Sequence, residues 1–87
     1  MKIIELKCWP LYYNALNSNR KRFEFRKNDR DFMVDDLLHI QEFYPDKKTY
    51  SGRSCLFRID YILKGDTALP LPPLGDYVIM SISKVNV

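Results

Sequence analysis

The alternation of hydrophobic and polar residues predicts five β-strands and one helix along the 87-residue chain. Apolar positions two apart are typical of strands with one buried face. The predicted strands cover residues 2–8, 21–26, 34–44, 53–63 and 76–85. Residues 10–17 instead predict a short helix, with Pro10 in its first turn, where the missing N–H costs no hydrogen bond.

The alternation also predicts which side chains share a face of a strand. In the second strand, Phe23 and Phe25 are expected to point one way, and Arg22, Glu24 and Arg26 the other. One face of the fourth strand is expected to hold Cys55, Phe57, Ile59, Tyr61 and Leu63, and the other face Arg58 and Asp60. Five strands joined mostly by hairpins, with one helix after the first strand, indicate an α+β, mainly β fold. We expect a small curved sheet or barrel with the helix beside it.

The connection at residues 64–75 contains three prolines and two glycines, so no strand can run through it. It is long for so small a domain, and loops of this kind often carry function. Its apolar part at 68–74 is a candidate docking segment for a protein partner, in a polyproline II conformation. The alternative is that it caps the open end of a barrel.

The length predicts a single domain over residues 1–87. A net charge of +3 is too small to establish nucleic-acid binding by itself, so that hypothesis depends on where the charges lie. Two cysteines without a CxxC spacing and a single histidine, His39, make no zinc site. We therefore expect a cytoplasmic protein without a metal or another cofactor. The N-terminal residues match neither a signal peptide nor a membrane span.

Six of the fourteen basic residues fall within residues 20–30: Arg20, Lys21, Arg22, Arg26, Lys27 and Arg30. Glu24 lies in their midst. A carboxylate flanked by arginines is suited to hold Arg26 in place, or to accept a hydrogen bond from a base or amide, rather than to act as a general acid. The planar guanidinium of Arg26 matches a phosphate. The alternative is a surface ladder of ion pairs, worth under about 1 kcal/mol per pair.

Three further residues complete the candidate binding site. Lys21, at the junction of helix and strand, could reach the same ligand, and Arg30 extends the basic patch. Tyr12 and Tyr13 are adjacent on the helix, so at most one of them is buried. We take Tyr13 as the aromatic residue that stacks on a base.

Four segments together resemble the ASCH domains of the PUA-like superfamily: ELKCWPLYYNAL, RKRFEFRKNDRDF, GRSCLFRIDYIL and YVIMSI. The chain is most similar to a small bacterial and phage group of unknown function. The ASCH signature G-x-K-x-x-E-x-R is matched at Lys21, Glu24 and Arg26, with Asn19 in place of the glycine. Asn is the residue best able to replace glycine at positive φ. The chain also departs from its relatives at Ile4 and at residues 34–36.

The resemblance implies a five- to six-stranded β-barrel whose Lys, Glu and Arg line a cleft. It implies a module that binds RNA or a nucleotide. The first alternative is an amidohydrolase of N4-acylated cytidines, in which Lys21 and Glu24 would be catalytic; that branch carries a hydroxyl residue where this chain has Glu24. The second alternative is a protein-interaction domain. The ligand and the oligomeric state stay open.

Overall fold

The computed structural model describes residues 1–65 and 74–86, which form five strands and one helix. The elements are β1 (Ile3–Cys8), α1 (Pro10–Asn17), β2 (Phe23–Lys27), β3 (Leu37–Tyr44), β4 (Thr49–Lys64) and β5 (Tyr77–Lys84). The mainly β fold with one short helix after the first strand is confirmed, and the helix has the expected limits. The candidate docking segment at 68–74 lies outside the described residues, apart from Leu74.

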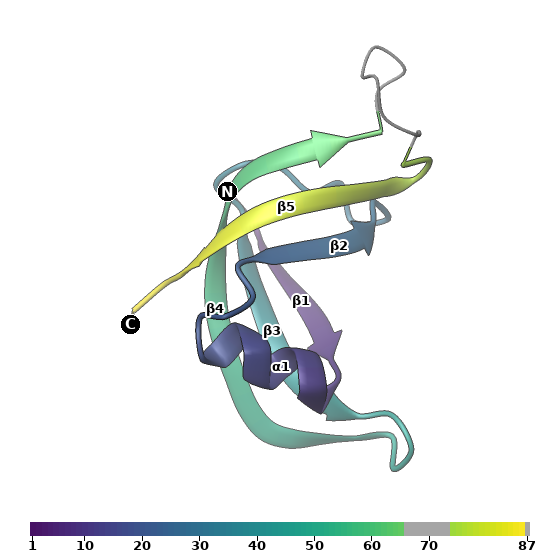
Figure 1. Ribbon diagram of the computed structural model, residues 1–87, viewed down its shortest axis with the longest axis vertical. Coiled ribbons are helices and arrows are strands. Elements are labelled where there is room, and N and C mark those ends of the chain that lie inside the picture. Colours follow the sequence, from purple (N-terminus) through teal and green to yellow (C-terminus); the bar gives the residue numbers. More distant parts are fainter. Residues whose placement is uncertain (66–73, 87) are drawn as a thin grey trace.

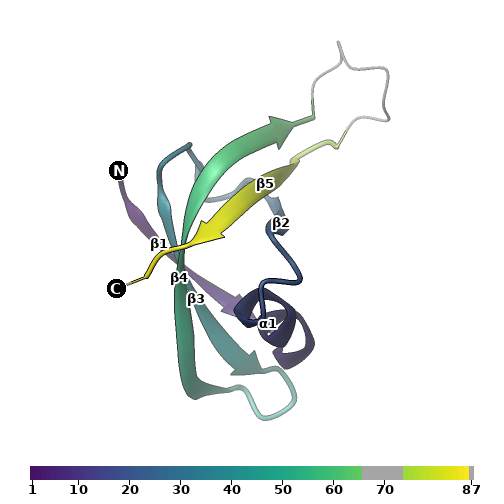
Figure 2. The same ribbon diagram turned by 60° about the vertical axis from the view of Figure 1, so that its left-hand side comes forward.

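The strands form one sheet in the order β1-β3-β4-β5-β2. β1 pairs in parallel with β3, and the other neighbours are antiparallel. The long strand β4 bends, so that the sheet curls into a half barrel with β1 and β2 as its two edges (Figure 1). The curled sheet partly surrounds α1, which lies beside β3 (Figure 2).

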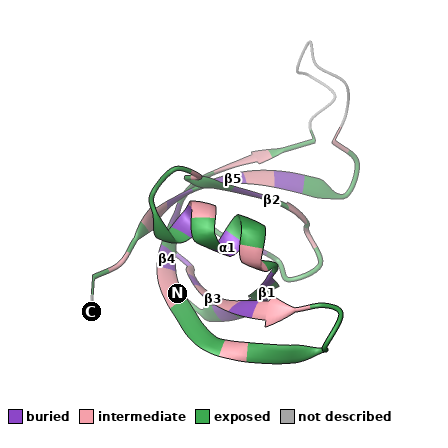
Figure 3. Cartoon of the chain, turned by 60° about the horizontal axis from the view of Figure 1, so that its bottom comes forward, coloured by how far each residue is buried: buried purple, intermediate pink, exposed green. Residues whose placement is uncertain are grey.

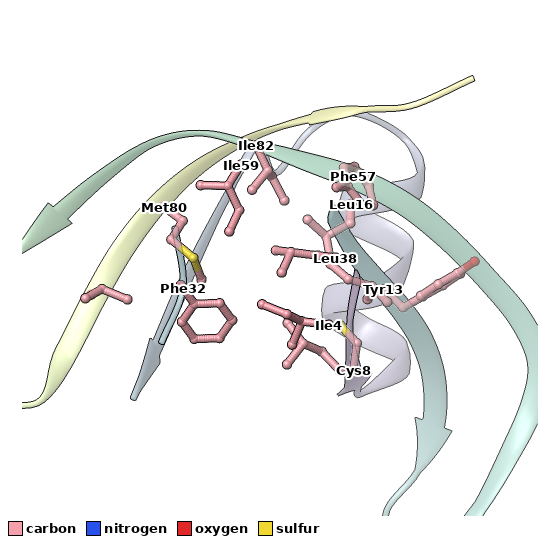
Figure 4. Close-up of a cluster of buried hydrophobic side chains, with 13 residues drawn as sticks. Ile4, Cys8, Tyr13, Leu16, Phe32, Leu38, Phe57, Ile59, Met80 and Ile82 are labelled. Atoms are coloured by element: carbon pink, nitrogen blue, oxygen red, sulfur yellow. The ribbon is translucent and has the colours of Figure 1, made fainter. Parts of the chain in front are cut away.

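The hydrophobic core fills the inside of the half barrel (Figure 4). Its residues come from α1, from the strands β1, β3, β4 and β5, and from the connection before β3. They are Ile4, Leu6, Cys8, Tyr13, Leu16, Phe32, Leu38, Ile40, Phe57, Ile59, Val78, Met80 and Ile82. The outward-facing residues of the strands remain exposed or half-buried (Figure 3).

β2 turns Glu24, and not its two phenylalanines, toward the inside of the sheet. Phe23 and Phe25 are 48% and 52% exposed, whereas Glu24 is 2% exposed. Glu24 is paired with Met80 of β5, which is fully buried, and paired residues share one face of a sheet. Strand periodicity correctly groups the two phenylalanines on one side, but it does not determine which side is inside.

β4 contains a bulge that the alternation did not predict. Ile59 pairs with Ile82, but Tyr61 pairs with Ser81, so Asp60 is an extra residue in the ladder. Beyond the bulge the inward and outward positions exchange. Tyr61 therefore does not share the buried face of Ile59, contrary to the prediction; it is 65% exposed, and Ile62 packs against the core instead.

Asp36 ties the connection before β3 to the N-terminus. Its buried carboxylate accepts hydrogen bonds from the backbone N–H groups of Lys2 (3.0 Å) and Met33 (3.1 Å). The Lys2 ammonium lies 2.9 Å from Oδ2. Burial alone would raise the pKa of Asp36, but the hydrogen bonds from Lys2 and Met33 outweigh it, so this pKa lies below its usual value.

This shift predicts acid-sensitive stability. Because the pKa of Asp36 is lower in the folded chain, the unfolded chain binds the proton more tightly. The contribution of Asp36 is complete above its unfolded pKa of about 4 and is lost as the pH falls through the folded value. We expect the stability difference between the wild type and Asp36→Asn to shrink between neutral and acidic pH in urea unfolding. A difference that stays constant with pH would contradict this account.

Candidate functional site

The C-terminal cap of α1 determines the position of Lys21, the first residue of the K-x-x-E-x-R motif. Asn19 has φ 63°, the left-handed conformation expected where the ASCH signature has glycine. Its N–H donates to the carbonyl of Leu16 (3.1 Å). The next N–H, of Arg20, donates to Ala15 (3.0 Å), which completes a Schellman motif. The chain therefore leaves the helix in a fixed direction, and Lys21 follows immediately.

Glu24 lies between two cations. Its Oε1 is 3.1 Å from Lys21 Nζ, and its Oε2 is 2.7 Å from Arg26 Nε. Both cations are partly exposed, whereas the carboxylate is buried. The surface-ladder alternative therefore does not describe Glu24. Lys21, and not Arg22, is the second partner, because Arg22 donates instead to the carbonyl of Asn19.

A cleft of about 580 Å³ surrounds this triad. It lies along β2 and is closed on the other side by the end of β1 and the start of α1. Its lining residues are Lys7, Cys8, Trp9, Tyr12, Lys21, Phe23, Glu24, Phe25, Arg26, Lys27 and Tyr77. Lys21, Glu24 and Arg26 are thus brought together in one cleft.

Five aromatic residues of the cleft are exposed: Trp9, Tyr12, Phe23, Phe25 and Tyr77. Lys21 Nζ lies 5.1 Å from the ring centroid of Tyr12 and 5.3 Å from that of Phe23. These cation–π contacts hold the ammonium between two rings. Trp9 was considered as a stacking residue from the sequence, but a place in the core or at a hinge was favoured for it, whereas it is exposed. Phe23, Phe25 and Tyr77 were not selected, because exposed aromatic residues look like core residues in a strand pattern.

Two arginines bridge the edges of the half barrel. Arg26 Nη2 donates to the carbonyl of Lys7 (2.8 Å), and Arg30 Nη1 donates to that of Glu5 (3.1 Å), both on β1. Arg30 does not line the cleft. The structure thus does not bring Arg30 together with Lys21, Glu24 and Arg26 in the cleft; instead, Arg30 attaches the connection after β2 to the edge of β1.

Tyr13, the predicted stacking residue, is 2% exposed and lies in the core. Its hydroxyl is 3.2 Å from Cys55 Sγ, and the Arg53 guanidinium lies 5.0 Å from its ring. Burial and the contact with Cys55 raise the pKa of Tyr13. Its neighbour Tyr12 is the exposed aromatic residue of the cleft, as required if only one of the pair is buried.

A family model described as "Domain of unknown function (DUF3850)" matches residues 3–82. The chain belongs to this family. The matched range contains every residue that lines the cleft. No curated protein matches the chain. The DUF3850 description names no ligand or reaction, so the cleft is the feature that bears on function.

The thiol of Cys8 is the one sulfur group lining the cleft of this DUF3850 domain within the described residues. Burial, and next the charge of Glu24, raise its pKa to about 11. A thiol with so high a pKa is a poor nucleophile near neutral pH. Among residues 1–65 and 74–86, no three His, Cys, Asp or Glu side chains gather as metal ligands. No helix in the described part is long and apolar enough to cross a membrane.

Proposed function

We propose that the cleft binds a nucleotide, either free or within single-stranded RNA. One observation carries this proposal: a buried carboxylate orders two cations, Lys21 and Arg26, among exposed aromatic rings. The volume of about 580 Å³ falls within the range of clefts that hold small ligands. Phosphate and base are the two chemical groups that such a lining recognises together.

The two cations retain hydrogen-bond donors for an anion. Among the described residues, Lys21 Nζ donates only to Glu24, and an ammonium has three N–H donors. Arg26 uses Nε and Nη2 for Glu24 and Lys7, which leaves three of its five N–H groups. Since Glu24 fixes both side chains before the ligand arrives, little side-chain entropy is lost on binding. A phosphate oxygen is a suitable acceptor for these donors.

The aromatic residues supply the second half of recognition. A base can stack on Trp9 or Tyr12, which are exposed at the start of α1. Stacking on aromatic side chains is how proteins hold unpaired bases, and each stacked base contributes about 1–3 kcal/mol. We also propose that the chain is an ASCH-like domain, on the support of its mainly β fold and the triad of Lys21, Glu24 and Arg26 in one cleft.

The amidohydrolase remains the second candidate, because Lys21 and Glu24 are in contact at 3.1 Å within the cleft. Such a hydrolase would use Lys21 to activate water or another nucleophile at the acyl carbon. We rank it below binding, since both oxygens of Glu24 already accept hydrogen bonds from cations. The protein-interaction alternative depended on residues 68–74, of which the structure describes Leu74.

The binding proposal predicts a fluorescence change at Trp9, the single tryptophan. A short single-stranded RNA and cytidine monophosphate are titrated separately into the protein, at low and at physiological salt. We expect the emission of Trp9 to change with both, and the RNA affinity to fall with salt because phosphates release counterions on binding. Lys21→Ala is expected to weaken binding about tenfold or more, since it removes a charge-assisted hydrogen bond.

Lys47→Ala is the matched control, because Lys47 lies in the β3–β4 hairpin and does not line the cleft. It should bind like the wild type. A parallel incubation with N4-acetylcytidine tests the second candidate, with cytidine and acetate followed by NMR. Unchanged Trp9 emission with both ligands would refute the binding proposal, and product formation that needs Lys21 would establish the hydrolase.

A further inference from the structure

A second surface of the protein also carries exposed apolar side chains, and the cleft accounts for only some of them. It is the outer side of β2, β5 and β4, opposite the buried side that holds Glu24 and Met80. We call it the aromatic face. It consists of Phe23, Phe25, Tyr61, Leu63, Tyr77 and Ile79.

The strand registers make this face continuous. Ser81 of β5 pairs with Phe23 on one side and with Tyr61 on the other. Ile79 likewise pairs with Phe25 and Leu63 in the next row. Paired residues project from the same side of a sheet, so each row crosses all three strands.

The first row has room for a planar ring. Phe23 and Tyr61 are two strand spacings apart, roughly 10 Å at the backbone. Between them lies only the small, exposed side chain of Ser81. In the second row, Phe25 packs on Tyr77 with 5.1 Å between the ring centroids, which extends the aromatic surface along β5.

Basic residues stand at both ends of the face. Lys27 pairs with Tyr77 at one end. At the other end, Arg58 pairs with Ser83, and Lys21 lies against the ring of Phe23. Asp60, at the bulge, is engaged by Arg58 (3.2 Å) and by the hydroxyl of Ser83. Since Asp60 compensates the charge of Arg58, the face combines exposed rings with a lysine near each end, Lys27 at one and Lys21 at the other.

We infer that the aromatic face stacks unpaired bases of a single-stranded nucleic acid that continues from the cleft, so that the ligand is an oligonucleotide. The inference rests on the proposed function. Phe23 and Phe25 belong both to the cleft lining and to the face, which makes the two surfaces continuous. Aromatic side chains on a sheet are able to stack two or three successive bases, while lysine and arginine hold the phosphates between them.

The charges favour this ligand over a second copy of the chain. If two aromatic faces met, the basic ends of one copy would lie against basic ends of the other in either strand direction, because both ends carry the same sign. Like charges brought together at an interface oppose association. A strand of phosphates and bases complements both the charged ends and the apolar centre.

Tyr61→Thr tests the face alone, because Tyr61 does not line the cleft and its side chain is mostly exposed. Threonine retains a high β propensity. The probes are adenosine monophosphate, followed by Trp9 emission, and a fluorescein-labelled adenylate decamer, followed by anisotropy. We expect the wild type to bind the decamer more tightly than the mononucleotide. Tyr61→Thr should weaken decamer binding by about 5- to 150-fold and leave mononucleotide binding unchanged.

Two variants serve as controls. Tyr61→Phe retains the ring and should bind the decamer like the wild type. Tyr50→Thr makes the same change at another exposed tyrosine of β4, outside the face, and should have no effect.

The outcomes separate the two proposals. Mononucleotide binding with decamer affinity unchanged in Tyr61→Thr would overturn the inference and leave the cleft proposal standing. Decamer binding that depends on Tyr61, without any change in Trp9 emission, would refute the cleft proposal and, with it, the inferred continuation of the ligand from the cleft onto the face. A wild-type dimer in sedimentation that Tyr61→Thr dissociates would assign the face to a second copy and overturn the inference.

Discussion

Replacing Glu24 with glutamine is expected to lower the free energy of unfolding by about 2–3 kcal/mol and to weaken nucleotide binding at least tenfold. Removing one partner of a buried ion pair costs about 3–5 kcal/mol, because the other charge is left without compensation. The expected loss is smaller here, since Lys21 and Arg26 are partly exposed and water can hydrate them. Glutamine fills the same volume, so the change isolates the charge.

The binding loss has a separate cause. In the variant, the amide oxygen of the glutamine can accept a hydrogen bond from Arg26 Nε. Its NH2 group then faces Lys21 Nζ, and both of these groups are hydrogen-bond donors. Lys21 is therefore no longer held in the cleft. Urea unfolding measures the first effect, and titration of Trp9 emission measures the second under conditions where the variant is folded.

Glu5→Gln is the control for Glu24→Gln. Glu5 is an exposed carboxylate on β1, in contact with His39 at 3.3 Å, and its loss should change stability by less than about 1 kcal/mol. If Glu24→Gln had an equally small effect on stability and none on binding, Glu24 would be no more than a surface charge. The central role given to the carboxylate would then be wrong.

The fold and the charged part of the site were predictable from local chemistry. The limits of α1, the left-handed Asn19 and the assembly of Lys21, Glu24 and Arg26 all depend on residues within about two turns of one another in sequence. Helix capping determines the first two features, and the alternation of side chains along a strand places Glu24 and Arg26 on one face. The K-x-x-E-x-R spacing therefore leads directly to one part of the cleft.

The orientation of β2 was not predictable in this way. The alternation separates Phe23 and Phe25 from Glu24 without naming the inner face, and the usual preference for burying apolar surface would favour the phenylalanines. The structure buries Glu24 instead, because Lys21 and Arg26 provide opposite charges at 3.1 and 2.7 Å. The exposed phenylalanines are thus linked to the buried carboxylate. Successive side chains of a strand point to opposite faces, so a Glu24 that points inward leaves Phe23 and Phe25 on the outer face.

Two other features were missed for the same physical reason, because they depend on residues that are distant in the sequence. The bulge at Asp60 moves Tyr61 outward, and it is set by the pairing of β4 with β5. Arg30 bonds to β1 only because the sheet curls and brings its edges together. Neither contact leaves a local pattern in the sequence.

Phe32→Ala is expected to destabilise the protein by about 3–5 kcal/mol. Phe32 lies in a polar connection, so its sequence context suggests a turn, yet its ring is buried in the core beside Met80 (Figure 4). Its N–H donates to Asn28 Oδ1 (3.2 Å), and Asp36 holds the following residue, Met33. These bonds fix the backbone while the ring fills the inside of the half barrel.

A small domain has a total stability of about 5–15 kcal/mol, so this one ring accounts for a large fraction of it. Urea unfolding of the wild type, Phe32→Ala and Phe25→Ala measures the effect. Phe25→Ala removes the same ring from an exposed position, where the main loss is the contact with Tyr77, and should cost about 1 kcal/mol. Equal losses in the two variants would show that the connection before β3 does not close the core. A much larger loss for Phe32 would mean that the half barrel is stabilised from its open side by a residue outside every strand.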